Sequence, residues 1–143
     1  MVIINLGRCI SKKLVKKIKI DKKRAKSLIL TANSKEITES KIPFNKINSI
    51  AKISLRYDVL RELLESLAIL NGYKIYNHEC YYSFLKEVLK EDNLAKRFDK
   101  ARIIRNSINY YGKPYLIEES KIILENISKA IRKVKNLLNK SNF

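Results

Sequence analysis

Residues that break or turn the backbone are scarce in this 143-residue chain, which has 3 glycines and 2 prolines. Hairpin turns and phosphate-cradling loops depend on glycine, so this scarcity disfavours sheet-rich folds and glycine-rich nucleotide loops. The chain also has no tryptophan and a single histidine. Because zinc sites and Cys/His or two-histidine mechanisms need more such side chains, most metalloenzyme classes are excluded, and we expect no metal and no cofactor.

Acidic residues are scarce as well. Lys and Arg number 31 against 14 Asp and Glu, which gives a formal net charge of +17. Hydrophobic residues make up 45% of the chain, too many for intrinsic disorder, while lysines interrupt the apolar runs that a membrane span would need. We therefore expect one globular domain over residues 1–143 that binds an anionic partner and does not enter a membrane.

The two cysteines, Cys9 and Cys80, lie outside any C-x-x-C spacing. Two buried structural thiols are the simplest interpretation, and a disulfide between them is the alternative. The first seven residues lack the basic region and apolar stretch of a signal peptide. We expect a cytoplasmic protein.

Over half of the net charge lies in an N-terminal arm at about residues 1–27, which has ten Lys and Arg against one Asp. Apolar residues at helical spacing, with Asp21 as an N-cap, predict a short helix followed by a longer one. A lysine-rich helix attracts phosphates of any sequence, so we assign nucleic-acid contacts to Lys12, Lys16 and Lys23. The alternative is that these lysines only keep the surface soluble.

The rest of the chain is dominated by helical periodicity. Residues 34–46 are rich in Ser, Thr and Asn and contain Pro43, which predicts an exposed loop. Apolar residues at helical spacing then predict helices over about 48–70, 78–91, 94–111 and 118–140. Gly72 and Gly112 are expected C-caps, and Asn77 is an expected N-cap. The fold class is therefore all-α, an antiparallel bundle of four or five helices.

One helix has an ordered polar stripe opposite its apolar face. Ser54, Asp58, Arg61 and Glu65 recur at spacings of four, three and four residues, so their charges can pair along the helix. A solvated face is the ordinary interpretation of such a stripe, and the wall of a cleft is the alternative.

A second polar cluster occupies one side of the helix predicted over 94–111. Its members share one arc of a helical wheel: Arg102, Arg105, Asn106, Asn109, Tyr110 and Lys113. Guanidinium groups bind phosphate, amides bind base edges and a phenol ring stacks on bases, so the cluster suits a nucleotide or an RNA strand. The alternative is a helix end at which the amides bond the backbone and the arginines cover apolar surface.

Three segments, 57–74, 76–80 and 105–112, resemble HEPN domains (higher eukaryotes and prokaryotes nucleotide-binding). The resemblance covers the helical body from about residue 49 onward. It implies a small all-α bundle, commonly a homodimer, that binds RNA or a nucleotide. In the ribonuclease members an Arg is followed by a polar residue and, four to six positions later, by a His at the dimer cleft.

Arg105 and Asn106 match the first two positions of that motif, but Tyr110, Tyr111 and Gly112 occupy the places where the His would stand. A phenol with a pKa near 10 moves protons poorly at neutral pH. His78 is the single imidazole that could take over the role. Its ordinary interpretation is a first-turn helix residue whose polar tip reaches solvent or a loop.

The resemblance implies a nucleic-acid-binding or nucleotide-binding protein of toxin–antitoxin or defence type with a degenerate ribonuclease motif. The catalytic candidates are Arg105, Asn106, Tyr110 and His78, and an active protein would cleave RNA without a metal. The nucleic-acid contacts are assigned to Arg102, Asn109, Tyr111, Lys113 and the three arm lysines. The alternatives are a non-catalytic module that binds a nucleotidyltransferase partner and a structural bundle whose charge is incidental.

Overall fold

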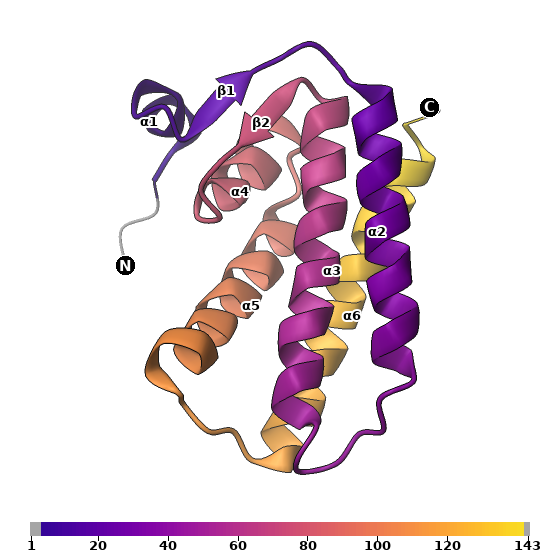
Figure 1. Ribbon diagram of the computed structural model, residues 1–143. Helices are drawn as coiled ribbons and strands as arrows, with labels where there is room; N and C mark the ends of the chain where they lie inside the picture. The colour runs from indigo at the N-terminus through magenta and orange to yellow at the C-terminus, as the bar shows by residue number, and fades with distance from the viewer. Residues whose placement is uncertain (1–3, 142–143) are drawn as a thin grey trace.

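The computed structural model of the protein describes residues 4–141 (Figure 1). The elements in chain order are α1 (Leu6–Ser11), β1 (Val15–Lys17), α2 (Lys22–Ser40), α3 (Ser49–Leu70), β2 (Tyr73–Ile75), α4 (Cys80–Ser83), the π-helical turn η1 (Phe84–Val88), α5 (Asp92–Tyr111) and α6 (Ile117–Asn139). The four long helices α2, α3, α5 and α6 alternate in direction and pack as an antiparallel bundle (Figure 1). The all-α class is thereby confirmed; the first three residues of the predicted arm lie outside the described residues.

Helix α3 is the central element of the bundle, because it packs against α2, α5 and α6. Its apolar stripe includes Ile53, Leu60 and Leu64, each with no exposed surface. The helix ends at Leu70, and Gly72, two residues later, has a φ of +83°, the left-handed conformation predicted for that end of the helix. Gly112 ends α5 in the same way, with a φ of +60°.

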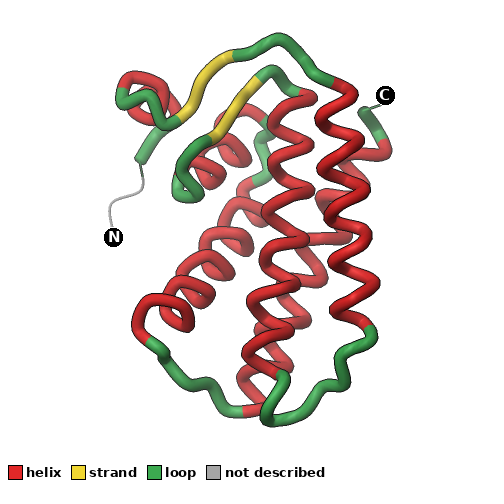
Figure 2. Tube along the Cα trace, in the orientation of Figure 1, coloured by secondary structure: helices red, strands yellow, loops and turns green. Residues whose placement is uncertain are grey.

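The N-terminal arm contains a short helix, α1, and the start of a longer one, α2, which Asp21 caps as predicted. The prediction is wrong for residues 15–17, which form a strand between the two helices. After α1 the chain turns at Lys13 and forms β1, which pairs antiparallel with β2 (Figure 2). Val15 lies opposite Ile75, and both side chains are buried. A strand of three residues is too short to show a period of two, so the sequence pattern contained no signal for it.

A disulfide bond joins Cys9 in α1 to Cys80 at the start of α4, across a sequence separation of 71 residues. The interpretation as two separate thiols is therefore wrong and the alternative is correct. Neither cysteine has exposed surface, and the N–H of Leu6 donates to the Glu87 carboxylate at 2.7 Å. The β1–β2 pair joins the N-terminal segment to residues 73–75, and the disulfide joins it to Cys80. Residues 76–79 therefore lie between two points of attachment.

Helix α2 continues to Ser40, so the loop predicted to begin at residue 34 begins at residue 41. This polar stretch is helical because its charges find partners on other helices: Lys35 pairs with Glu62, and Lys135 pairs with Glu36 at 2.6 Å. Glu39 is buried, and burial by itself would raise its pKa. Hydrogen bonds from Arg56 and Lys52, together with their charges, outweigh burial and lower the pKa of Glu39. Tertiary ion pairs thus override the weak local helix propensity.

The remaining helices match their predicted ranges closely, with one exception. The helix expected from His78 begins at Cys80 and becomes a π-helical turn at Phe84, so His78 lies in the connection before it. Among residues 4–141, no helix combines the length and the apolar character that a membrane crossing requires.

Candidate functional site

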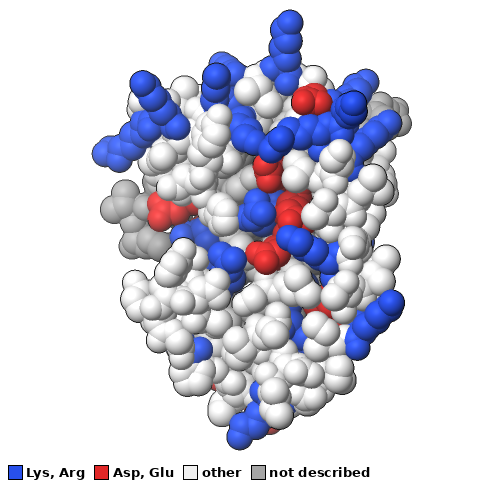
Figure 3. All heavy atoms as spheres, in the orientation of Figure 1, with Lys and Arg blue, Asp and Glu red and all other residues white. Residues whose placement is uncertain are grey.

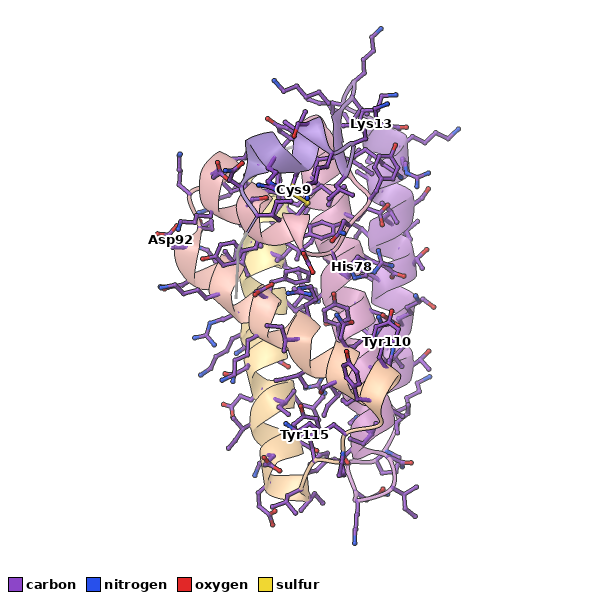
Figure 4. All side chains as sticks on the ribbon, turned by 90° about the vertical axis from the view of Figure 1, so that its left-hand side faces the viewer. Cys9, Lys13, His78, Asp92, Tyr110 and Tyr115 are labelled. Atoms are coloured by element: carbon purple, nitrogen blue, oxygen red, sulfur yellow. A yellow bond between two sulfur atoms is a disulfide. The ribbon has the colours of Figure 1, made fainter. Side chains whose placement is uncertain are left out.

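The only imidazole of the chain, His78, lies between β2 and α4 (Figure 4). The Asn77 side chain accepts the N–H of Glu79 at 2.8 Å and so fixes this turn. The His78 ring lies against two tyrosine rings, Tyr57 of α3 and Tyr81 of α4, with centroids 6.2 Å away in each case. The Tyr57 hydroxyl is hydrogen-bonded to Nδ1 of His78 at 3.1 Å. The ring is therefore held on two sides.

Arg105 of α5 reaches the same tyrosine. Its guanidinium carbon lies 5.4 Å from the centre of the Tyr57 ring, within the range of a cation–π contact. One terminal nitrogen lies 3.4 Å from the Asp58 carboxylate, a long and weak pairing. Its buried Nε has no hydrogen-bond partner among the described residues. Arg105 is therefore a guanidinium with unused donor capacity.

Tyr57 links the two groups, because its hydroxyl contacts His78 and its ring faces Arg105. The side chain has no exposed surface, and its ring stacks on Phe98 of α5 with centroids 5.8 Å apart. Burial raises the pKa of the Tyr57 hydroxyl, which therefore stays protonated. We use the name α3–α5 cleft for this cluster of side chains, which consists of Tyr57, Asp58, His78 and Arg105.

Two further arginines border the cleft, and each has acidic partners. Arg61 pairs with Glu65 at 3.2 Å, and Arg102 donates to Asp99 at 2.9 Å. The polar stripe of α3 is therefore partly buried and ion-paired rather than freely solvated, since Asp58 contacts Arg105 and the Arg61 side chain is only 25% exposed. Acidic and basic side chains alternate down the middle of this face (Figure 3).

His78 is electrostatically unusual. Burial, followed by the charges of Arg61, Arg105 and Arg102, lowers the pKa of His78 to about 4. The imidazole is therefore neutral at neutral pH. A half-buried neutral imidazole with a strongly lowered pKa beside several guanidinium groups marks His78 as a candidate functional residue.

The predicted polar arc on α5 divides into two parts. Arg102 is only 8% exposed, so the prediction that it shares an accessible arc with Asn109 and Tyr110 is wrong; its pairing with Asp99 buries it. Arg105 and Asn106 are half-buried, and Asn109, Tyr110 and Tyr111 are exposed toward the C-terminal end of the helix. Figure 4 shows Tyr110 on α5 below His78, nearer that end.

The other predicted contacts lie outside the cleft. Lys113 is exposed and its ammonium lies 5.1 Å from the centre of the Tyr115 ring. Three arm lysines, Lys12, Lys16 and Lys23, are exposed. Basic side chains crowd the end of the molecule that carries β1 and the start of α2, at the top of Figure 3. The structure thus separates a diffuse basic surface from a compact cleft.

Tyr57 and Asp58 of the cleft, and Arg61 at its border, were not among the functional candidates from the sequence. Tyr57 belongs to the apolar face of α3, and Arg61 belongs to the polar stripe, so each had an ordinary explanation. The available signal was a tyrosine on the apolar face of α3, next to Asp58 of its polar stripe. Among residues 4–141, no cluster of three or more His, Cys, Asp or Glu side chains suits a metal ion.

Comparisons of the chain with protein-family models, curated proteins and solved structures found no match. The residues of the α3–α5 cleft and of the basic surface are therefore the features that indicate its function.

Proposed function

We propose that the protein binds RNA as a HEPN-type domain of toxin–antitoxin or defence type, with a ligand phosphate bound in the α3–α5 cleft. The observation that carries the proposal is that Arg105 and His78 both contact one buried tyrosine, Tyr57. Arg105 lies over its ring, and His78 is hydrogen-bonded to its hydroxyl. These two residues belong to separate segments that both carry the HEPN resemblance.

The chemistry of Arg105 supports a phosphate ligand. A guanidinium presents donors in a planar fork that matches two phosphate oxygens, and a partly desolvated guanidinium binds them more strongly. Asp58 satisfies Arg105 only at 3.4 Å, and Nε is unpartnered among the described residues, so an oxyanion would add hydrogen bonds that the free protein lacks.

The basic surface supports RNA over a small anion. Lysines such as Lys12, Lys16 and Lys23 would attract a polyanion from any direction, and single strands are the usual target of a site that combines cations with tyrosines. Tyr110 and Tyr111 are 73% and 84% exposed on α5, so their rings are accessible for stacking on bases.

Ribonuclease activity is a second candidate, favoured by the contact network that places His78 near Arg105. Arg105 would stabilise charge on the scissile phosphate, and His78 would move the proton. The lowered pKa of His78, about 4, argues for binding without cleavage, because such an imidazole is a weak base.

An RNA assay with three proteins tests the proposal. We expect the wild type to retain labelled single-stranded RNA and leave it intact without metal, and Tyr110→His to gain cleavage, because an imidazole would stand at the motif position. Cleavage by the wild type that is lost in His78→Asn would assign the proton transfer to His78. Failure of the wild type to retain RNA at low salt would contradict the proposal.

We further propose a homodimer formed through the connection between α5 and α6. Leu116 and Ile117, at 68% and 37% exposed, leave apolar surface there, and this part of Figure 3, at the lower left, has few charged side chains. Leu116→Glu should shift the sedimentation coefficient from dimer to monomer. Leu30→Glu, at a site 70% exposed on α2, is the matched control and should leave the dimer intact. A wild-type monomer at every concentration would contradict this proposal.

A further inference from the structure

His78 is surrounded by charged and titratable groups from three helices. Facing it are Tyr57, Asp58 and Arg61 from α3, Tyr81 from α4, and Arg102 and Arg105 from α5. Its neighbour Glu79 lies 3.8 Å from Arg102, with its own side chain 57% exposed. In the free protein burial, followed by the guanidinium charges, lowers the pKa of His78, so the imidazole does not hold a second proton at neutral pH.

A bound phosphate would reverse that balance. A phosphodiester carries one negative charge, and on Arg105 it would lie within the same buried environment as His78. An opposite charge near an imidazole favours its protonated form, and weak screening inside a protein strengthens the effect.

We propose that the α3–α5 cleft takes up a phosphate group and a proton together, the phosphate on Arg105 and the proton on His78. This inference rests on the proposed function, since it concerns the same site. It adds a regulation of that site by pH: the affinity for the phosphate ligand increases as the solution becomes more acidic.

Tyr57 is the positioning residue for this step. While His78 is neutral, either the Tyr57 hydroxyl or Nδ1–H can be the donor in their hydrogen bond. In the proposed arrangement the protonated hydroxyl donates to Nδ1, which places the ring proton on Nε2. When the ring gains a proton at Nδ1, that N–H donates to the Tyr57 oxygen, and the hydroxyl turns from donor to acceptor. The proton comes from water, and the hydrogen bond at 3.1 Å is kept in both states.

The sign of the pH dependence follows from linkage. The complex holds more protons than the free protein between a pKa of about 4 for free His78 and its higher value in the complex. Affinity should therefore rise about tenfold per pH unit as the pH falls through that interval, and stay constant above it.

The single histidine allows a direct test by NMR of protein labelled with nitrogen-15 in histidine. The ligand is 2′-O-methyl oligouridylate, whose bases and phosphodiesters do not titrate between pH 4 and 8 and which cannot be cut through its 2′-oxygen. We expect the pKa of His78 to rise by at least about one unit in the saturated complex. Sulfate, added to a second sample, is expected to cause a smaller rise.

Three variants control the experiment. Arg105→Gln should remove the rise on ligand binding, whereas Arg97→Gln, an exposed arginine on the same helix, should preserve it. Tyr57→Phe keeps the ring beneath Arg105 but removes the hydrogen bond to Nδ1 of His78. The nitrogen-15 shifts of the neutral ring should then show a mixture of the Nδ1–H and Nε2–H tautomers. An unchanged pKa of His78 in a saturated oligouridylate complex overturns this inference while RNA binding stands. A rise with sulfate but no binding of oligouridylate overturns the proposed RNA function alone, and no response to either ligand overturns both.

Discussion

Replacing both cysteines, Cys9→Ser with Cys80→Ser, is expected to lower the free energy of unfolding by about 4 kcal/mol. The disulfide closes a loop with a sequence separation of 71 residues, and removing such a cross-link frees the unfolded chain to explore many more conformations. The loss is large against the 5–15 kcal/mol or so that stabilises an ordinary domain.

Urea unfolding followed by circular dichroism measures this loss. The oxidised wild type should have a clearly higher midpoint than the double-serine protein, and wild type treated with dithiothreitol in urea and refolded under reducing conditions should match the variant. Equal midpoints for oxidised and reduced wild type would show that the cross-link does not stabilise the fold. The double-serine protein should also show faster amide exchange around residues 76–79, because the disulfide at Cys80 no longer holds the end of this segment.

Replacing Arg105 with Gln is expected to weaken binding of single-stranded RNA by about 10-fold to 100-fold. Glutamine removes the charge and the guanidinium fork, and hydrogen bonds to a charged group contribute about 1.5–3 kcal/mol each. Fluorescence anisotropy with a labelled oligouridylate at low salt measures the change.

Arg97→Gln is the matched control, because it removes the same charge from an exposed position on α5 and should change affinity only slightly. Equal losses in Arg105→Gln and Arg97→Gln would mean that net charge alone binds RNA. Replacing Lys12, Lys16 and Lys23 together with Gln should instead reduce the slope of log affinity against log salt by about 2, since each lost phosphate contact removes about 0.7.

Periodicity and end signals made much of the bundle predictable. The apolar stripe of α3 and the glycines at 72 and 112 lie close to the observed ends of α3 and α5. These signals are local, since a helix ends where glycine adopts a left-handed conformation and begins where a side chain caps it. Asp21 caps α2 as expected, accepting the N–H of Arg24 at 3.0 Å.

The parts that could not be predicted depend on distant partners. Val15 is in a strand because Ile75 lies opposite it, and Glu39 is helical and buried because Lys52 and Arg56 neutralise it. Neither partner is visible in the local pattern. The disulfide is similar: two cysteines so far apart in sequence reveal their pairing only once the fold brings α1 onto α4.

The candidate site shows the same division. Arg105 was identified from its helix and from the HEPN resemblance, and His78 from being the only histidine. Their association through Tyr57 required the structure, because residues 57, 78 and 105 come from three separate segments. The burial of Arg102 could not be predicted either, since the helical wheel placed it beside Arg105 but did not show that Asp99 pairs with it.

The most direct test of the α3–α5 cleft as the RNA site is a crystal structure of the protein with a short 2′-O-methyl oligouridylate. A phosphate oxygen should lie at hydrogen-bond distance from the Arg105 guanidinium, with Asp58 displaced from it and His78 beside the ligand. RNA bound only to the lysines of the N-terminal arm, with the Arg105–Asp58 pair intact, would contradict the account.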